Sequence, residues 1–85
     1  MSNPLEKELL AIAIKYVEDE DPAPKVIAKG RGEIAEVIIA EAAKHHIAVQ
    51  AHPQLAHMVE GVELNHYIPF EAYYLAAKIL GDLNK

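Results

Sequence analysis

A run of six apolar residues at positions 9–14 sets the strongest limit on the fold of this chain. The run is far shorter than the roughly 20 residues that a membrane-spanning helix needs. It is also short for a helix of a globular protein, and acidic residues and prolines follow it within a few positions. The pattern therefore predicts a strand over residues 9–16, buried on both faces as strands of parallel sheets are.

The rest of the chain alternates short apolar runs with turn residues. A loop is predicted over residues 17–24, which hold two prolines and four consecutive acids. We expect further strands over residues 25–29 and 47–49, and helices over residues 33–46, 54–62 and 70–83. Helical periodicity places the following residues on inward faces: Ile34, Ala35, Val37, Ile38, Ile39 and Ala42 in the first helix, Leu55, Met58, Val59 and Val62 in the second, and Tyr73, Ala76, Ala77 and Leu80 in the third.

The order of these elements predicts the fold class. A strand, a helix and a further strand in succession imply a parallel pair joined by a right-handed crossover. We therefore expect an α/β fold with a small, mainly parallel sheet of three strands, or four, flanked by three or four helices. The fourth helix would be a turn over residues 4–8, since Asn3-Pro4 has the pattern of a helix start. The 85 residues allow one domain, placed at residues 10–85 after an N-terminal segment of residues 1–9.

Charge and composition exclude several classes of function. The formal net charge of −5 disfavours binding to the phosphate backbone of a nucleic acid. The first eight residues carry three charges and no long apolar core, so we expect neither a cleaved signal peptide nor direct membrane insertion. Cysteine is absent, which fits a reducing compartment, and we expect a cytoplasmic protein. The acids at positions 18–21 leave two interpretations open, a solvated loop or an acidic docking site.

Side chains suited to catalysis are scarce. Ser2 is the only serine, and threonine and cysteine are absent, so no nucleophile with a nearby base can be assembled. Gly30-Arg31-Gly32 matches no phosphate-binding motif. We therefore expect no enzymatic activity, no cofactor and no metal. A ligand- or metal-sensing module is the alternative function, because five histidines are present, although none has the spacing of a zinc motif: His45, His46, His52, His57 and His66.

From Ala11 onward the sequence resembles the cytoplasmic C-terminal domain of the FlhB/YscU family, the export-switch proteins of flagellar and injectisome type III secretion systems. The first half matches in AIAIKY at residues 11–16, AP at 23–24 and VIAKG at 26–30. The second half matches at Ala35, Ile38, His46-Ile47, PQLA at 53–56, IP at 68–69 and EAY at 71–73. The resemblance implies a non-enzymatic component or regulator of a type III export apparatus, with other export-apparatus proteins as its partners.

The sequence departs from the family at one motif. Family members carry Asn-Pro-Thr-His before the first matched strand and cleave themselves between the asparagine and the proline. The corresponding positions here hold Glu6, Lys7, Glu8 and Leu9, and a glutamate has no side-chain amide that could cyclise. We therefore expect no self-cleavage, and we interpret Asn3-Pro4 as a helix start. We also expect a free-standing relative that imitates the fragment left after cleavage.

Two surfaces are predicted to bind partners. Family members have one further strand before the cleavage motif, so its absence would leave the first strand open to a strand from a partner, such as the membrane-bound switch protein. That strand comprises Leu9, Leu10, Ala11, Ile12, Ala13 and Ile14. The second surface is the loop of Pro22, Ala23, Pro24 and Lys25, which the resemblance places in the region linked to substrate-class switching. A blunted or central strand and a simple connector are the respective alternatives.

Overall fold

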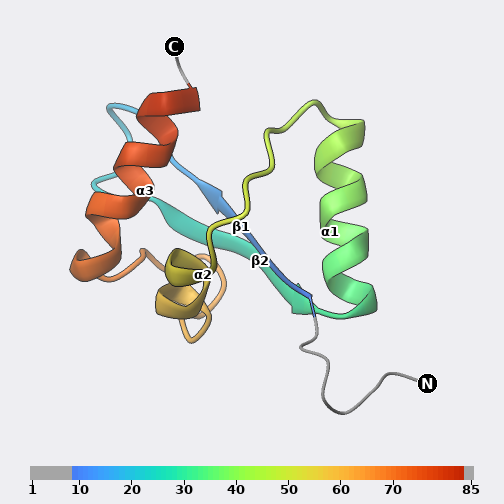
Figure 1. Ribbon diagram of the computed structural model, residues 1–85. Helices are drawn as coiled ribbons and strands as arrows, with labels where there is room; N and C mark the ends of the chain where they lie inside the picture. The colour runs from blue at the N-terminus through green and yellow to red at the C-terminus, as the bar shows by residue number, and fades with distance from the viewer. Residues whose placement is uncertain (1–8, 84–85) are drawn as a thin grey trace.

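The structure, a computed structural model, describes residues 9–83. Its elements, in chain order, are β1 (Leu10–Lys15), β2 (Lys25–Arg31), α1 (Glu33–Lys44), α2 (Pro53–Val59) and α3 (Phe70–Leu83) (Figure 1). The predicted α/β class is confirmed, as are the first two strands and the three helices. Helix boundaries differ from the predicted ones by up to three residues, as is common where helix ends fray.

The two strands form an antiparallel hairpin, so the predicted parallel sheet of three or four strands is wrong for residues 9–83. Leu10 lies opposite Arg31 and Lys15 opposite Lys25, with an irregularity after Ala13 that leaves Ile27 without a partner. The short loop between the strands explains the direction. It can reverse the chain, whereas a parallel pair needs a crossover of a dozen or more residues.

Residues 47–49, predicted as the third strand, form no strand. They belong to the connector from α1 to α2, where Ile47 is 60% exposed and Val49 54% exposed. The backbone N–H of Ile47 donates back to the carbonyl of Ala42, at 2.7 Å. The β-branched residues give this segment strand propensity, but propensity becomes a strand only beside a neighbour that pairs with it. No such neighbour lies beside the connector among residues 9–83.

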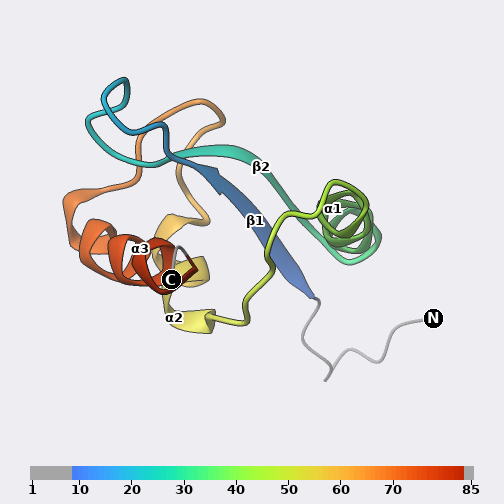
Figure 2. The same ribbon diagram turned by 90° about the horizontal axis from the view of Figure 1, so that it is seen from above.

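The hairpin lies between two unequal layers. Figure 2 shows α1 on one side of the strands and α2 with α3 on the other. The hydrophobic core is on the α2–α3 side, where Ile12 and Ile14 of β1 pack against it. It consists of Val26, Leu55, Val59, Ile68, Ala72 and Ala76. Helix α1 instead packs against the opposite face of β1 and β2, where Ala11 and Ala35 are buried.

The predicted inward faces of the helices are correct for α2 and partly wrong for the other two. In α3 the core takes Ala72, Leu75 and Ile79 beside the expected Ala76, and Ala77 is exposed. Apolar residues surround most of α3, so the period alone did not select one face. In α1 the expected core residues Ile34 and Val37 are 61% and 60% exposed. The face opposite Ala35 lacks a covering layer among residues 9–83.

Glycine allows the close approach of α1 to β2. A Cβ atom at Gly30 would overlap the side chain of Ile34 in the first turn of α1. The next glycine, Gly32, has a φ of 60° and begins the helix, a conformation that glycine adopts without steric cost. The tight passage from strand to helix therefore explains the Gly-Arg-Gly sequence.

Candidate partner-binding surfaces

The outer edge of β1 carries backbone groups that have no hydrogen-bond partner among residues 9–83. The N–H of Gly32 donates to the carbonyl of Leu9 at 2.8 Å, which fixes the alternation of the ladder. Because successive residues of a strand point their polar groups to opposite sides, the N–H and C=O groups of Leu10 and Ile12 face away from β2. Within residues 9–83, no hydrogen bond joins these groups to another element. β1 is therefore an edge strand in the described part of the chain.

The other side of β2 is already occupied along the first half of the strand. Val26 donates to the carbonyl of His66 at 3.0 Å and accepts from Asn65 at 2.6 Å. Lys25 forms an isolated antiparallel bridge with Tyr67, and Ile68 donates to the carbonyl of Pro24 at 2.9 Å. The segment before α3 thus borders the first half of β2. The outer edge of β1 has no such neighbouring segment among residues 9–83.

The side chains of the predicted β1 surface mostly point inward. Ala11 is buried, whereas Leu9, just before the strand, is 48% exposed. Ile12 and Ile14 pack against the core, and Leu10 is half-buried. β1 therefore offers a partner its backbone rather than a row of side chains. Glu6, Lys7 and Glu8, the other positions that replace the cleavage motif, lie outside the described residues.

The acidic loop is folded around Asp21. The Asp21 carboxylate accepts from the N–H of Val17 at 2.9 Å, while the carbonyl of Val17 accepts from the N–H groups of Glu20 and Asp21. The same carboxylate lies 3.9 Å from the ammonium of Lys25. Asp21 therefore holds the turn together, and its neighbours Glu18, Asp19 and Glu20 are exposed.

A hollow of about 300 Å³ lies beside this loop. It is lined by Pro22, Ala23, Ile68, Phe70 and Tyr73. Phe70 at the start of α3 is 89% exposed, which is unusual for an aromatic ring. Of the four residues predicted for this second surface, Pro22 and Ala23 line the hollow, whereas the side chain of Pro24 is fully buried. No local pattern pointed to the contribution of α3, because Phe70 and Tyr73 lie about 50 positions away from the loop.

Tyr16, directly after β1, interacts with the charges of the acidic loop. Loss of hydration raises the pKa of its hydroxyl, and Tyr73 and the negative charges of Glu18, Asp19 and Asp21 raise it further. The negative potential of the loop thus extends to the aromatic side chains. A partner segment that docks here would meet apolar rings beside exposed carboxylates.

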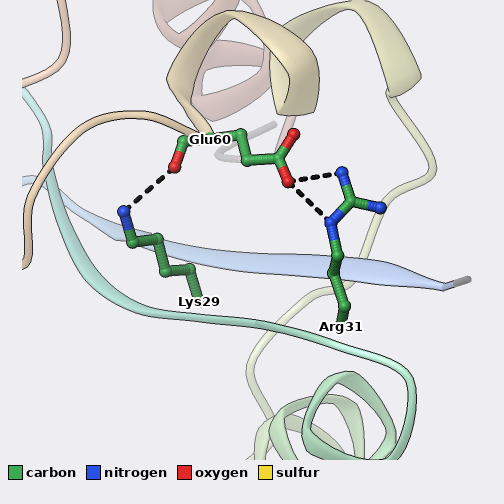
Figure 3. Close-up of polar contacts among 3 residues, drawn as sticks. All are labelled: Lys29, Arg31 and Glu60. Carbon is green, nitrogen blue, oxygen red and sulfur yellow. Dashed lines mark hydrogen bonds and ion pairs between the residues drawn. The ribbon is translucent and has the colours of Figure 1, made fainter.

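Lys29 and Arg31 on β2 fasten the end of α2 to the hairpin (Figure 3). The Lys29 ammonium donates to the carbonyl oxygens of Glu60, at 3.0 Å, and Val62, at 2.6 Å. The Nε atom of Arg31 donates to the Glu60 carboxylate at 2.7 Å, and the guanidinium forms an ion pair with it. Carbonyls at a helix C-terminus lack partners within the helix, so Lys29 caps α2. Lys29 was noted only as part of the VIAKG match, and Glu60 was missed.

The described residues, 9–83, also bear on metal binding and membrane crossing. No three histidine, aspartate or glutamate side chains come together there in a group that could hold a metal ion. His52 instead caps α2, because its Nδ1 atom accepts from the N–H of Leu55 at 3.1 Å. In the same range, none of the helices has the length and apolar character needed to cross a membrane.

The fold is also found in solved structures of other proteins. The structure is similar to the cytoplasmic domain of FlhB from Shewanella putrefaciens, with a TM-score of 0.84, 31% identity, and coverage of 89% of this chain and 64% of that one. It is also similar to the PscU C-terminal domain, with a TM-score of 0.82 and 28% identity over 87% of this chain and 95% of that one.

The chain belongs to the FlhB HrpN YscU SpaS family, whose model matches residues 2–82. It is 35% identical to the uncharacterized protein YlqH of Bacillus subtilis over 88% of this chain and 81% of YlqH. It is 39% identical to the flagellar biosynthetic protein FlhB of Aquifex aeolicus over 84% of this chain and 21% of FlhB. The chain thus spans about a fifth of that FlhB, and most of YlqH. The resemblance to the FlhB/YscU C-terminal domain is confirmed.

Proposed function

We propose that this domain is a non-enzymatic component or regulator of a type III protein export apparatus, acting at the cytoplasmic face of the membrane. The family membership and the similarity to the FlhB cytoplasmic domain support this role. The observation that carries the mechanism is the outer edge of β1, where Leu10 and Ile12 present backbone groups without partners among residues 9–83. The partner would be another export protein, such as a membrane-bound switch protein.

The binding mode is strand addition to β1. An added strand would form hydrogen bonds with the outward groups of Leu10 and Ile12 and would complete the ladder on that side. Exposed edges of this kind readily pair with a further chain. The connector offers a second supporting feature, since Ile47 and Val49 are exposed residues with strand propensity that pair with no strand among residues 9–83. An added strand would supply a neighbour.

The hollow beside the acidic loop is the second proposed surface. Phe70 and Tyr73 give it aromatic side chains, and Pro22 stiffens one wall, which lowers the entropy lost on docking. The exposed acids of the loop favour a segment that combines apolar and basic side chains. We propose that this surface contacts exported proteins or their regulators.

Strand addition is tested at Leu10, whose N–H faces outward. Leu10→Pro removes this donor without removing a bond of the β1–β2 ladder, a position where edge strands tolerate proline. Leu10→Ala is the matched control, because it shortens the side chain and keeps the N–H. Both variants are checked for folding by thermal melting and then titrated with the cytoplasmic segment of the switch protein. We expect at least tenfold weaker binding for the proline variant only. Equal binding by a folded Leu10→Pro or Ile12→Pro variant would contradict strand addition.

The chain is also proposed not to cleave itself. Glu6 stands where the family has the reacting asparagine, so the residue required for cyclisation is missing. Mass spectrometry of the purified protein after prolonged incubation should give only the intact mass. A fragment corresponding to cleavage after Asn3 would show that the Asn3-Pro4 bond has taken over the reaction.

A further inference from the structure

The outward face of α1 is apolar in its middle and charged at its ends. Ile34 and Val37 are 61% and 60% exposed, and Ala40 and Ala43 are exposed beside them. Figures 1 and 2 show α1 at one end of the described molecule, with its outer side turned away from α2 and α3. Apolar side chains gathered on one helix face commonly mark an interaction surface.

The charges of this face are arranged with opposite signs at its two ends. Glu33 and Glu36 lie in the first turn of α1, and Lys44 lies in the last turn. His45 follows directly, and its ring lies 3.4 Å from the Glu41 carboxylate. A helix with acids at its start and a cation at its end is complementary to itself when two copies lie antiparallel.

We propose that the outward face of α1 binds α1 of a second copy of this chain, in an antiparallel pair related by a two-fold axis. Glu33 of each copy would then lie at the level of Lys44 of the second copy, and Val37 at the level of Ala40. Both pairs are centred on the same point of the helix, so a single alignment of the two helices forms both pairs. Such an interface is isologous, and every contact in it occurs twice.

The helical wheel supports this register. At 100° per residue, Glu33, Val37, Ala40 and Lys44 lie along the middle of the face opposite the buried Ala35. These four residues form the seam of the proposed dimer. Ile34 and Glu41 lie on one border of this seam, and Glu36 and Ala43 lie on the other. A two-fold axis places each border beside the same border of the second copy, so Glu36 of one copy does not meet Glu41 of the second. The small side chains of Ala40 and Ala43 allow the helices to approach closely.

The size of the face sets the strength of the association. Helix α1 has 12 residues, which makes it about 18 Å long. An interface of about three helical turns falls in the range of weak or transient complexes. The dimer would therefore be in exchange with the monomer. It goes beyond the proposed export function, because α1 packs on a face of the hairpin and leaves the outer edge of β1 accessible.

The test measures self-association of the full chain by sedimentation equilibrium up to about 1 mM protein. The wild type should show a monomer–dimer equilibrium. Lys44→Glu replaces two cross-dimer ion pairs with like-charge contacts and should lower the association constant roughly 3- to 30-fold. Glu71→Lys changes an exposed charge on α3 and should leave the constant unchanged. Val37→Glu removes the apolar centre and should abolish the dimer while retaining binding of a strand partner at β1.

A mixing experiment separates specific pairing from a general charge effect. Glu33→Lys has lysine at both ends of the seam, and Lys44→Glu has glutamate at both ends. Each variant alone should associate weakly, whereas their equimolar mixture should form a heterodimer at least as stable as the wild-type dimer. A wild type that stays monomeric to 1 mM would overturn the proposal. So would a dimer that Val37→Glu leaves intact, or a mixture that associates no better than its components.

Discussion

The Lys29 ammonium donates a hydrogen bond of 2.6 Å to the carbonyl oxygen of Val62, 33 positions further along the chain. This bond and the parallel one to Glu60 tie the middle of β2 to the end of α2. Both acceptors are main-chain carbonyls, so the contact depends on the position of the helix end rather than on the side chains there. It joins the hairpin to the layer that covers its core face.

Lys29→Met should lower the free energy of unfolding by about 2 kcal/mol. The substitution keeps the length of the aliphatic chain but removes both donors, and hydrogen bonds from a charged group contribute roughly 1.5–3 kcal/mol. Denaturation by urea measures the change. Lys78→Met is the matched control, since Lys78 is exposed on α3, and it should stay within about 0.5 kcal/mol of the wild type. Equal losses in both variants would show that the loss comes from charge removal alone.

Gly30→Ala should destabilise the protein by about 1–3 kcal/mol, because the added methyl group overlaps the Ile34 side chain and pushes α1 off the hairpin. Thermal melting gives the effect directly. At Gly61 an added Cβ meets nothing within 4 Å, so Gly61→Ala should be nearly neutral. A neutral Gly30→Ala would mean that α1 is not held against β2 as closely as described.

The cap on α2 predicts a graded series at His52. His52→Ala removes the acceptor for the N–H of Leu55 and should cost about 1 kcal/mol, whereas His52→Asn supplies another accepting side chain and should cost less. His57→Ala changes an exposed histidine of the same helix and serves as the control. If His52→Asn proved as unstable as His52→Ala, packing of the ring rather than capping would be its role.

Stability should fall in alkaline solution, in part through Tyr16. The pKa of its hydroxyl is raised above the ordinary value of 10.0 in the folded protein, so the folded state disfavours tyrosinate. The unfolded chain therefore loses this proton at lower pH, and the contribution of Tyr16 to stability is lost as the pH rises above 10.0. Urea midpoints measured between pH 8 and beyond 10 should decline less steeply in Tyr16→Phe. Parallel declines in the two proteins would assign the effect to other groups.

Local chemistry predicted the elements better than their pairing. The short apolar runs that predict strands over residues 9–16 and 25–29, and the helical periods further along the chain, were enough to place both strands and three helices. Strand direction was not predictable from periodicity, because Ile12 and Ile14 would be apolar in either kind of sheet. The third strand failed for a related reason. Ile47 and Val49 have the right side chains, but a strand also requires a neighbour outside its own sequence.

The candidate surfaces were likewise predicted in part, and the contacts between distant segments were not. The strand at residues 9–14 and the loop at Pro22 and Ala23 were both proposed as binding surfaces because of the family resemblance. Contacts between distant segments were missed, as with Phe70 and Tyr73 beside the loop and Glu60 beside Lys29. The helical period also placed Ile34 and Val37 in the core, which is wrong. The period indicates that a helix face is apolar, but it does not indicate whether another element covers that face.

The hairpin and α1 come entirely from residues before position 45, whereas the layer that buries Val26 comes from residues after position 52. On a ribosome, the first half would emerge complete while its core face was still bare. At synthesis rates of about 5–20 residues per second, the remaining part of the chain follows within roughly 2–8 s. During that interval the side of β1 that Leu55 and Val59 later cover is open to other nascent chains. The outer edge of β1 is open as well. Until α2 and α3 are in place, the half-formed domain therefore exposes an apolar surface of the kind that is prone to aggregation.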